Sequence, residues 1–140
     1  MINFNIEIEK FKLTEKRKKK RWLNALISRE SYKLLELNYI FLNDESLLKI
    51  NKEYLNHDTY TDIITFDNSE EKLSIEGDIF ISVDRIRENA SKFQVSFEIE
   101  MIRVMAHGLL HLCGYLDKKE KDVRNMREKE NYYIKQYGKF

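Results

Sequence analysis

The sequence predicts an α+β fold in which a four-stranded mixed sheet is covered by about five helices. Segments that alternate apolar and polar residues, as half-buried strands do, are interspersed with segments of helical periodicity. Their order along the chain is β-α-β-α-β-β-α-α-α. The two consecutive strands predict an antiparallel pair, whereas the β-α-β passages at the start predict parallel pairing, so the sheet is expected to be mixed.

The first three elements follow from alternation, capping and composition. Residues 2–11 alternate apolar and polar side chains, which is typical of a half-buried strand. Thr14 is a suitable N-cap for a helix over residues 15–28. Residues 35–42 are rich in Tyr, Phe and Ile, and this composition favours a second strand.

The middle of the chain predicts a helix followed by the two consecutive strands. Asn43 or Asp44 can begin a helix that continues through Tyr54, with three apolar residues in its middle for the buried side. Residues 62–66 form a short apolar strand, and residues 77–83 form the next one after a polar turn.

Three helices complete the predicted fold. Ser82 or Asp84 begins a helix that ends near residue 93, and Ser96 can cap the long apolar helix that follows. The last helix covers residues 119–137 and places four apolar or aromatic residues along one side: Val123, Met126, Tyr133 and Tyr137.

Residues 107–117 have the pattern of a metal site at the end of this long helix. His107 and His111 lie four residues apart, so both imidazoles project from one helix face. Gly114 ends the helix because glycine accepts the left-handed conformation, and the chain can then fold back to bring Asp117 to the same cation. Three ligands with an open fourth position are typical of a catalytic rather than a structural metal site.

Two other interpretations fit parts of this pattern. A histidine on an apolar face is often a core residue, and Asp117 alone is compatible with a solvated residue or a helix cap. The spacing also resembles that of metzincin-type zinc proteases, in which a Glu directly after the first histidine is the general base. Gly108 stands at that position and cannot accept a proton, which disfavours peptide hydrolysis.

Four blocks of the chain lie in register with the motifs of one family. Residues 107–115 are similar to its signature His-Gly-x-Leu-His-Leu-x-Gly-Tyr-Asp-His, and residues 77–82 to its strand Gly-Asp-Ile-x-Ile-Ser. Residues 51–66 are similar to Asn-x-x-Tyr/Phe-Arg-x-x-Asp-x-x-Thr-Asp-Val-Leu-Ser-Phe, and Met126 fits a Met in the acidic helix after the last ligand. Over roughly residues 34–130, the chain therefore resembles the YbeY family of bacterial metal-dependent endoribonucleases.

The resemblance implies a function in rRNA maturation and ribosome biogenesis, with RNA and ribosomal subunits as partners. It implies that His107, His111 and Asp117 hold one divalent metal ion per chain, for which zinc is the first expectation. A metal ion can polarise a phosphoryl oxygen and lower the pKa of water, which suits hydrolysis of an RNA phosphodiester bond. No residue is assigned as the general base.

The chain departs from the family pattern at two positions. Asp117 stands where the family usually has a third histidine, and a carboxylate is a harder ligand that adds negative charge. Leu55 stands where the family usually has an arginine, whose planar fork suits phosphate. His57 and Arg103 are the candidates to replace that cation. Arg103 lies one helical turn before His107, where it can contact RNA or form an ordinary salt bridge.

Length and composition predict one globular domain over residues 1–140, and the resemblance implies that this domain is of metal-dependent hydrolase type. The chain has 42% hydrophobic and 35% charged residues, and no apolar stretch approaches the length of a membrane span. Its acidic N-terminal segment does not fit a signal peptide, so we expect a cytoplasmic protein. The single cysteine, Cys113, agrees with a reducing compartment and is expected to be a small buried residue.

A basic run from Lys16 to Arg21 stands out against a net charge of +1. The run can attract RNA phosphates, with Lys18, Lys19 and Lys20 as candidate contacts, or it can be the solvated face of an amphipathic helix. It also supports a second class of function, a non-catalytic ribosome-associated RNA-binding factor whose metal is structural. Leu55, in place of the family arginine, favours that alternative.

Overall fold

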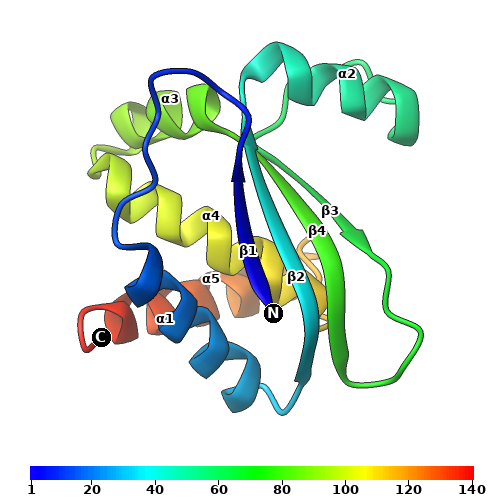
Figure 1. Cartoon of the computed structure of the whole chain (residues 1–140), viewed down its shortest axis with the longest axis vertical. Helices are drawn as coiled ribbons and strands as arrows, with labels where there is room; N and C mark the ends of the chain where they lie inside the picture. Colours follow the sequence, from blue (N-terminus) through cyan, green and yellow to red (C-terminus); the bar gives the residue numbers. More distant parts are fainter.

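A four-stranded sheet in the order β1-β2-β4-β3 forms the centre of the computed structural model, which describes residues 1–140 (Figure 1). Strands β1 (Ile2–Ile6), β2 (Lys33–Leu42) and β4 (Ser74–Ser82) are parallel to one another. Strand β3 (Ile63–Asp67) runs antiparallel to β4. The predicted mixed sheet, with its antiparallel pair of consecutive strands, is confirmed.

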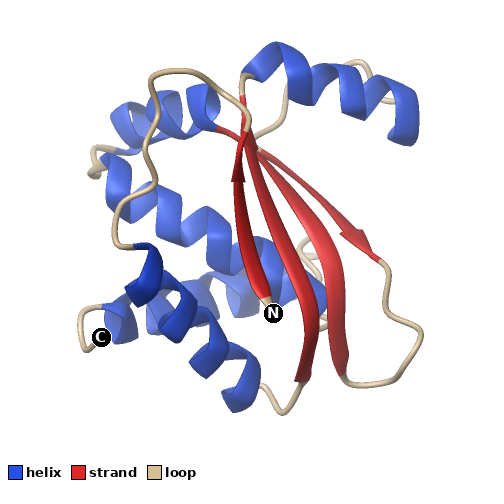
Figure 2. Cartoon of the chain, viewed as in Figure 1, coloured by secondary structure: helices blue, strands red, loops and turns tan.

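Five helices surround the sheet, as predicted, and they cover its two faces unequally. Helices α1 (Lys16–Arg29), α4 (Phe97–Leu112) and α5 (Glu120–Tyr137) bury their apolar residues in one core of 27 residues, together with the start of α3 (Val83–Phe93). Helix α2 (Asp44–Leu55) packs over a separate cluster of four buried residues on the other face. Figure 2 shows the resulting layers, with most of the helical mass on one side of the strands.

The two-residue period of β2 explains how one strand serves both faces. Leu37, Tyr39 and Phe41 point into the large core, whereas Ile40 and Leu42 pack against α2. Helix α4 is apolar on most sides because it lies between the sheet and its neighbouring helices. The Tyr39 hydroxyl donates a hydrogen bond to the Met105 carbonyl at 2.8 Å and so joins the centres of sheet and helix.

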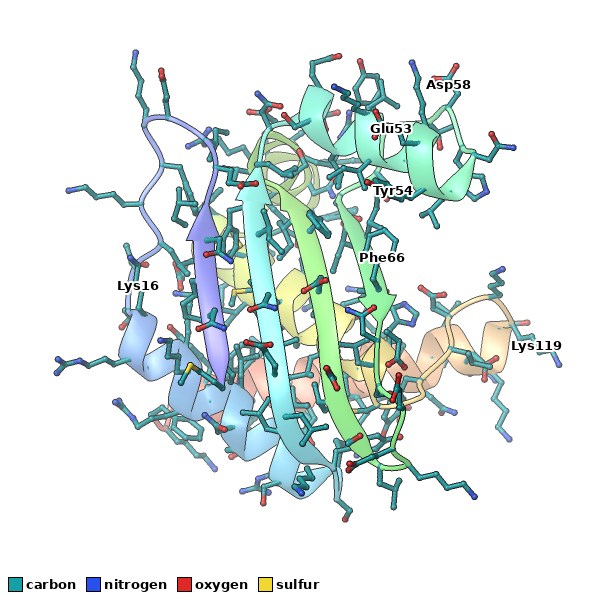
Figure 3. The ribbon with its side chains drawn as sticks, turned by 45° about the vertical axis from the view of Figure 1, so that its right-hand side comes forward. Lys16, Glu53, Tyr54, Asp58, Phe66 and Lys119 are labelled. Carbon is teal, nitrogen blue, oxygen red and sulfur yellow. The ribbon has the colours of Figure 1, made fainter.

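The outer face of the sheet is polar where α2 does not cover it. Asn3, Asn38 and Asp78 stand side by side in the strand register and form a hydrogen-bonded row, with N–O distances of 2.8 Å and 3.0 Å. At one end of this face, Tyr54 of α2 and Phe66 of β3 lie together, with ring centroids 6.1 Å apart (Figure 3). Polar side chains thus cover the part of this side that lies beyond the small core under α2.

Helix caps were predicted at the start of four helices, and the structure confirms three of them. Asn43, Ser82 and Ser96 each accept a backbone N–H bond at the start of α2, α3 and α4. Thr14 does not cap α1, because Glu15 occupies the N-cap position in a left-handed conformation. The Thr14 hydroxyl donates instead to Glu98 at 3.1 Å and ties the segment before α1 to α4.

The strand predicted over residues 2–11 is shorter than expected. Its last ladder bond joins the Glu7 N–H to the Phe41 carbonyl, and β2 itself ends at Leu42, so residues beyond this point have no strand partner. Phe11 and Leu13 are buried all the same, in the connection to α1. None of the helices combines the length and apolar composition that a bilayer crossing requires.

Gly108 marks the closest approach of α4 to the sheet. A Cβ atom at this position would lie 2.7 Å from the Ile63 Cδ1 atom and 3.0 Å from the Ile79 Cγ2 atom. The residue after His107 therefore faces the sheet and not the side of α4 on which the two histidines lie. A protease-type Glu at this position would be directed into packed strands, which adds a steric reason against that chemistry.

Gly108→Ala should lower the free energy of unfolding, because overpacking costs about 1–3 kcal/mol and exceeds the helix propensity gain of about 0.5–1 kcal/mol. Gly138→Ala is the control, since its Cβ would have 3.6 Å of space and its backbone is right-handed. Urea unfolding measures both variants. Equal stability of Gly108→Ala and the wild type would contradict the close packing.

Glu30 joins the end of α1 to α5 and to the loop before it. Its carboxylate accepts hydrogen bonds from the Tyr115 hydroxyl at 2.8 Å, the Lys129 ammonium at 3.2 Å and the Tyr133 hydroxyl. Burial alone would raise the pKa of Glu30, but these hydrogen bonds outweigh burial and hold the pKa below its ordinary value of 4.5. The ionised carboxylate is thus the form that the fold stabilises.

Glu30→Gln should destabilise the protein at neutral pH by about 1.5–3 kcal/mol, the usual range for hydrogen bonds to a charged group. Because the folded-state pKa is lowered, the contribution of Glu30 is present above pH 4.5 and is lost as pH falls through the folded-state pKa. The difference in the free energy of unfolding between the variant and the wild type should therefore become smaller in acid. Urea unfolding across this pH range measures the difference, and Glu120→Gln, at an exposed position, is the control. A stability difference that grows in acid would contradict the role of Glu30.

Candidate metal centre and its cleft

Three side chains converge where α4 ends. The His107 Nε2, His111 Nε2 and Asp117 Oδ2 atoms form a triangle with sides of 3.0 Å, 3.1 Å and 3.3 Å. Ligand atoms of a tetrahedral site with bonds of about 2.0–2.1 Å stand roughly 3.3–3.4 Å apart. The triangle therefore has the size of one face of such a site, and the donor set of two imidazoles and a carboxylate fits a divalent ion.

The turn after α4 brings Asp117 to the two histidines. Gly114 has a φ angle of 94°, in the left-handed region, and its N–H donates to the His111 carbonyl at 3.0 Å. The Tyr115 N–H donates to the Leu110 carbonyl at 3.0 Å, which closes the turn. Cys113 caps the helix and is buried, as predicted. The glycine turn predicted from the sequence is thus present.

Each histidine is oriented by a partner on its other ring nitrogen. The His107 Nδ1–H group donates to Glu130 Oε2 at 2.6 Å, and the His111 Nδ1–H group donates to the Tyr115 carbonyl at 2.9 Å. This arrangement leaves both Nε2 atoms free toward the centre of the triangle. Outer partners of this kind fix the tautomer and ring orientation of metal-binding histidines.

Glu130 lies on α5 and is shared between two residues of α4. Its Oε1 atom accepts from the Arg103 guanidinium at 3.0 Å while its Oε2 atom holds His107. Burial would raise the pKa of Glu130, but the hydrogen bonds from His107 and Arg103 keep it below its ordinary value. For His107, burial opposes protonation, yet Glu130 and Asp117 raise the pKa of the ring above its ordinary value.

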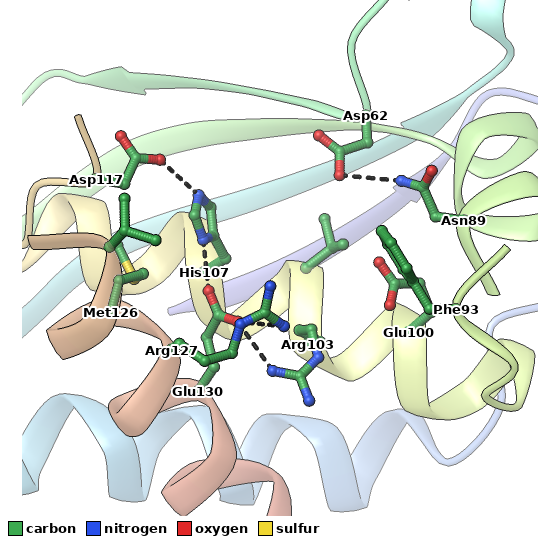
Figure 4. A pocket seen from close by; sticks show the side chains of 12 residues that line it. Asp62, Asn89, Phe93, Glu100, Arg103, His107, Asp117, Met126, Arg127 and Glu130 are labelled. Atoms are coloured by element: carbon green, nitrogen blue, oxygen red, sulfur yellow. Dashed lines mark hydrogen bonds and ion pairs between the residues drawn. The ribbon is translucent and has the colours of Figure 1, made fainter. Parts of the chain in front are cut away.

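A cleft of about 330 Å³ opens beside the triangle (Figure 4). His107 and Asp117 line one end of it, and α5 contributes Met126, Arg127 and Glu130 to its side. The rest of its wall comes from α3, α4 and the segment before β3: Asp62, Asn89, Phe93, Glu100, Arg103 and Val104. Val123 also lines the cleft and is 46% exposed, whereas Met126, Tyr133 and Tyr137, which were placed on the same side of this helix, are buried.

Of the predicted RNA contacts, Arg103 lines the cleft but Lys19 is excluded. Lys19 is fully buried and pairs with Glu98, with further hydrogen bonds to the Thr14 carbonyl and the Tyr137 hydroxyl. This lysine is an internal tie of the fold and cannot reach RNA. Lys16, at the start of the basic run, lies at the opposite side of the molecule from Lys119, which precedes α5 (Figure 3).

Leu55 and His57 lie at a second cleft of about 490 Å³, which reaches His111 from the other side. Lys118 also lines this second cleft. Neither Leu55 nor His57 lines the main cleft beside His107. The only cationic side chains in the main cleft are those of Arg103 and Arg127.

Sequence reasoning assigned no individual role to several residues that the fold brings to this site. Glu130, Arg127, Asp62, Asn89, Phe93 and Glu100 all line the main cleft. Glu130 lies 23 residues after His107 on a helix with many acidic residues, so its position alone does not distinguish it. Its burial in the structure distinguishes Glu130 from the other acidic residues of α5, because a buried carboxylate requires a specific partner.

Glu130→Gln should weaken zinc affinity by roughly 10–100-fold, the usual effect of losing an outer partner of a ligand histidine. Glu128→Gln is the control, because it removes the same charge from the exposed side of α5. Competition with a fluorescent zinc chelator measures the affinity, and thermal unfolding checks that both variants fold. Equal zinc affinity in the two variants would remove Glu130 from the site.

Comparisons with known proteins identify the family of this chain. The family profile described as Endoribonuclease YbeY matches residues 3–138. A Cytophaga hutchinsonii protein named Endoribonuclease YbeY is 52% identical over 93% of this chain and 91% of its own length. A Flavobacterium johnsoniae protein of the same name is 54% identical over 96% and 95%. The solution structure of a Thermotoga maritima protein matches 98% of this chain and 89% of its own, with a TM-score of 0.69 and 26% identity. The chain belongs to the YbeY endoribonuclease family.

Proposed function

We propose that this protein is a metal-dependent endoribonuclease that hydrolyses phosphodiester bonds of ribosomal RNA during its maturation. The observation that carries the proposal is the triangle of His107, His111 and Asp117 at the mouth of an open cleft, in a chain of this family. Ribosomal subunits would be the natural form of the substrate, and the cytoplasm the place of action.

The donor set supports one divalent ion per chain, with zinc as the first choice. Two imidazoles and one carboxylate are common zinc ligands, and three protein ligands leave a fourth position open toward the cleft. A zinc ion held there would supply Lewis acidity at a phosphoryl oxygen and make water more acidic. The carboxylate of Asp117 adds negative charge and so moderates that acidity relative to three histidines.

The cleft's own residues have separate tasks in this proposal. Glu130 holds the His107 ring so that its Nε2 atom faces the centre. Arg103 is mostly buried and is committed to Glu130, which makes it a positioning residue. The Arg127 side chain is 59% exposed, and its Nη1 atom lies 3.7 Å from the Glu130 Oε1 atom. This guanidinium therefore remains available for a phosphate oxygen. Arg127 thus supplies the cation that Leu55 cannot.

The basic run of α1 would act at a distance from the cleft. Lys20 is exposed and Lys18 is partly exposed, and each can still attract RNA phosphates in a salt-dependent way. The alternative of a non-catalytic RNA-binding factor with a structural metal is less favoured by the geometry. A structural site is normally closed by four protein ligands, whereas this triangle borders an open cleft.

His107→Ala and His111→Ala should each abolish metal binding and RNA cleavage, because two remaining ligands hold a divalent ion poorly. Asp117→Ala should weaken binding less, since water can replace one oxygen ligand. Asp122→Asn, on the neighbouring helix, is the control. Elemental analysis and cleavage of ribosomal RNA within isolated subunits are measured on the same preparations. A wild-type protein that holds metal yet never cuts would support the binding factor, and full metal in both histidine variants would show a misassigned site.

A further inference from the structure

The end of the main cleft farther from the triangle has chemistry of its own. Glu100 of α4 and Asp62 before β3 place two carboxylates there, and α3 contributes Asn89 and Phe93. Figure 4 shows these four side chains together at one end of the cleft, with His107 and Asp117 at the other. No part of the proposed hydrolysis uses them.

Glu100 is buried without a partner. The residue is only 4% exposed, yet its carboxylate accepts no hydrogen bond and has no cation within 4 Å, although it lines the cleft. Burial raises the pKa of Glu100, and it also raises the pKa of Asp62, whose carboxylate has the Asn89 amide at 3.5 Å and its own backbone as partners. The Glu100 carboxylate oxygens are not sealed in the core, and Asp62 is only half-buried, so both carboxylates can accept hydrogen bonds from a donor that enters the cleft.

The residues at this end fit a hydrogen-bond donor with a flat apolar face. Two carboxylates repel phosphate, which excludes the RNA backbone itself. Phe93 is 56% exposed and presents its ring to the cleft, beside the apolar side chain of Val104. Unstacked bases of single-stranded RNA are bound in this way, by stacking on an aromatic ring and by hydrogen bonds to their edges.

The distance to the triangle suits one nucleotide. Glu100 precedes His107 by seven residues on the same face of α4, which corresponds to roughly 10.5 Å along the helix axis. A nucleotide whose phosphate lies beside the triangle and Arg127 would therefore extend its base toward Glu100. Among the bases, guanine has two adjacent N–H donors on its Watson–Crick edge, which match the two oxygens of one carboxylate.

We propose that Glu100, Asp62, Asn89 and Phe93 form a guanine-binding subsite, so that the enzyme selects RNA with a guanosine next to the phosphate at the metal centre. The inference rests on the proposed nuclease function for the placement of the phosphate. Glu100 accepts from the guanine edge, Phe93 stacks on the ring, and Asp62 with Asn89 completes the polar wall. The subsite gives the cleft a base preference that the triangle alone cannot supply.

Mononucleotides test the subsite without any cleavage step. The 5′-monophosphates of guanosine, adenosine, cytidine, uridine and 2′-deoxyguanosine are titrated into the zinc-loaded protein, and affinities are read from NMR shifts. The guanosine nucleotide should bind at least about tenfold tighter than those of the other bases, in line with the usual value of a bidentate base contact. The deoxy form should bind as well as the ribose form, since the base and not the sugar is held.

Glu100→Gln and Phe93→Ala should each reduce guanosine monophosphate affinity about tenfold and leave uridine monophosphate unchanged. Phe93 is exposed, so its removal leaves the fold intact even if Glu100→Gln does not. Glu88→Gln on α3 and Leu73→Ala are the exposed controls outside the cleft, and both should bind like the wild type.

Equal affinity for all four bases, or a guanine preference that survives both variants, would overturn the subsite. Loss of binding with the deoxy nucleotide alone would assign the carboxylates to ribose and would overturn it as well. These outcomes are independent of nuclease activity. A protein that prefers guanosine but never cuts RNA would support the subsite and contradict the proposed function. A nuclease without base preference would support the proposed function and contradict the subsite.

Discussion

The bond between the Glu130 carboxylate and the His107 ring is the interaction on which the site depends. The same carboxylate also holds Arg103, so one buried acid on α5 fixes two side chains of α4. A buried carboxylate needs such partners to remain ionised, and the histidine needs a partner on Nδ1 to direct its Nε2 atom outward. The packing of α5 against α4 and the geometry of the donor triangle therefore depend on the same carboxylate. The indole Trp22 N–H, which donates to the Tyr133 carbonyl at 2.7 Å, anchors α5 to α1 and supports that docking.

The rotational position of α4 is set from the opposite side, by the sheet. Gly108 lets the helix approach Ile63 and Ile79, and the preceding residue, His107, is turned by about 100° around the helix axis. The imidazole consequently faces the cleft and α5. A larger residue at position 108 would push the helix outward and move both histidines with it. The contact between Gly108 and the sheet thus determines where the two imidazoles lie.

Local patterns were sufficient for most of the fold and for the donor triangle. The spacing of His107, His111 and Asp117 lies within eleven consecutive residues, so helix geometry and one glycine turn specify it. What the sequence could not give are contacts between distant segments. Lys19 belongs to a run of six basic residues, and only its pairing with Glu98, 79 residues later, explains its burial. Val123 shares a helical period with buried residues, yet the cleft opens beneath it. The acceptors at the far end of the cleft come from three separate segments, which no single pattern joins.

The lengths of the strands have a consequence for how the molecules behave in a crowded solution. The central strands β2 and β4 have ten and nine residues, but both edge strands, β1 and β3, have only five. An exposed strand edge is a template for pairing with another chain, and a short edge offers few free N–H and C=O groups. The polar row of Asn3, Asn38 and Asp78 removes the apolar surface that would reward such pairing. A sheet whose outer face is covered only in part by α2 thus offers another chain little strand edge and little apolar surface.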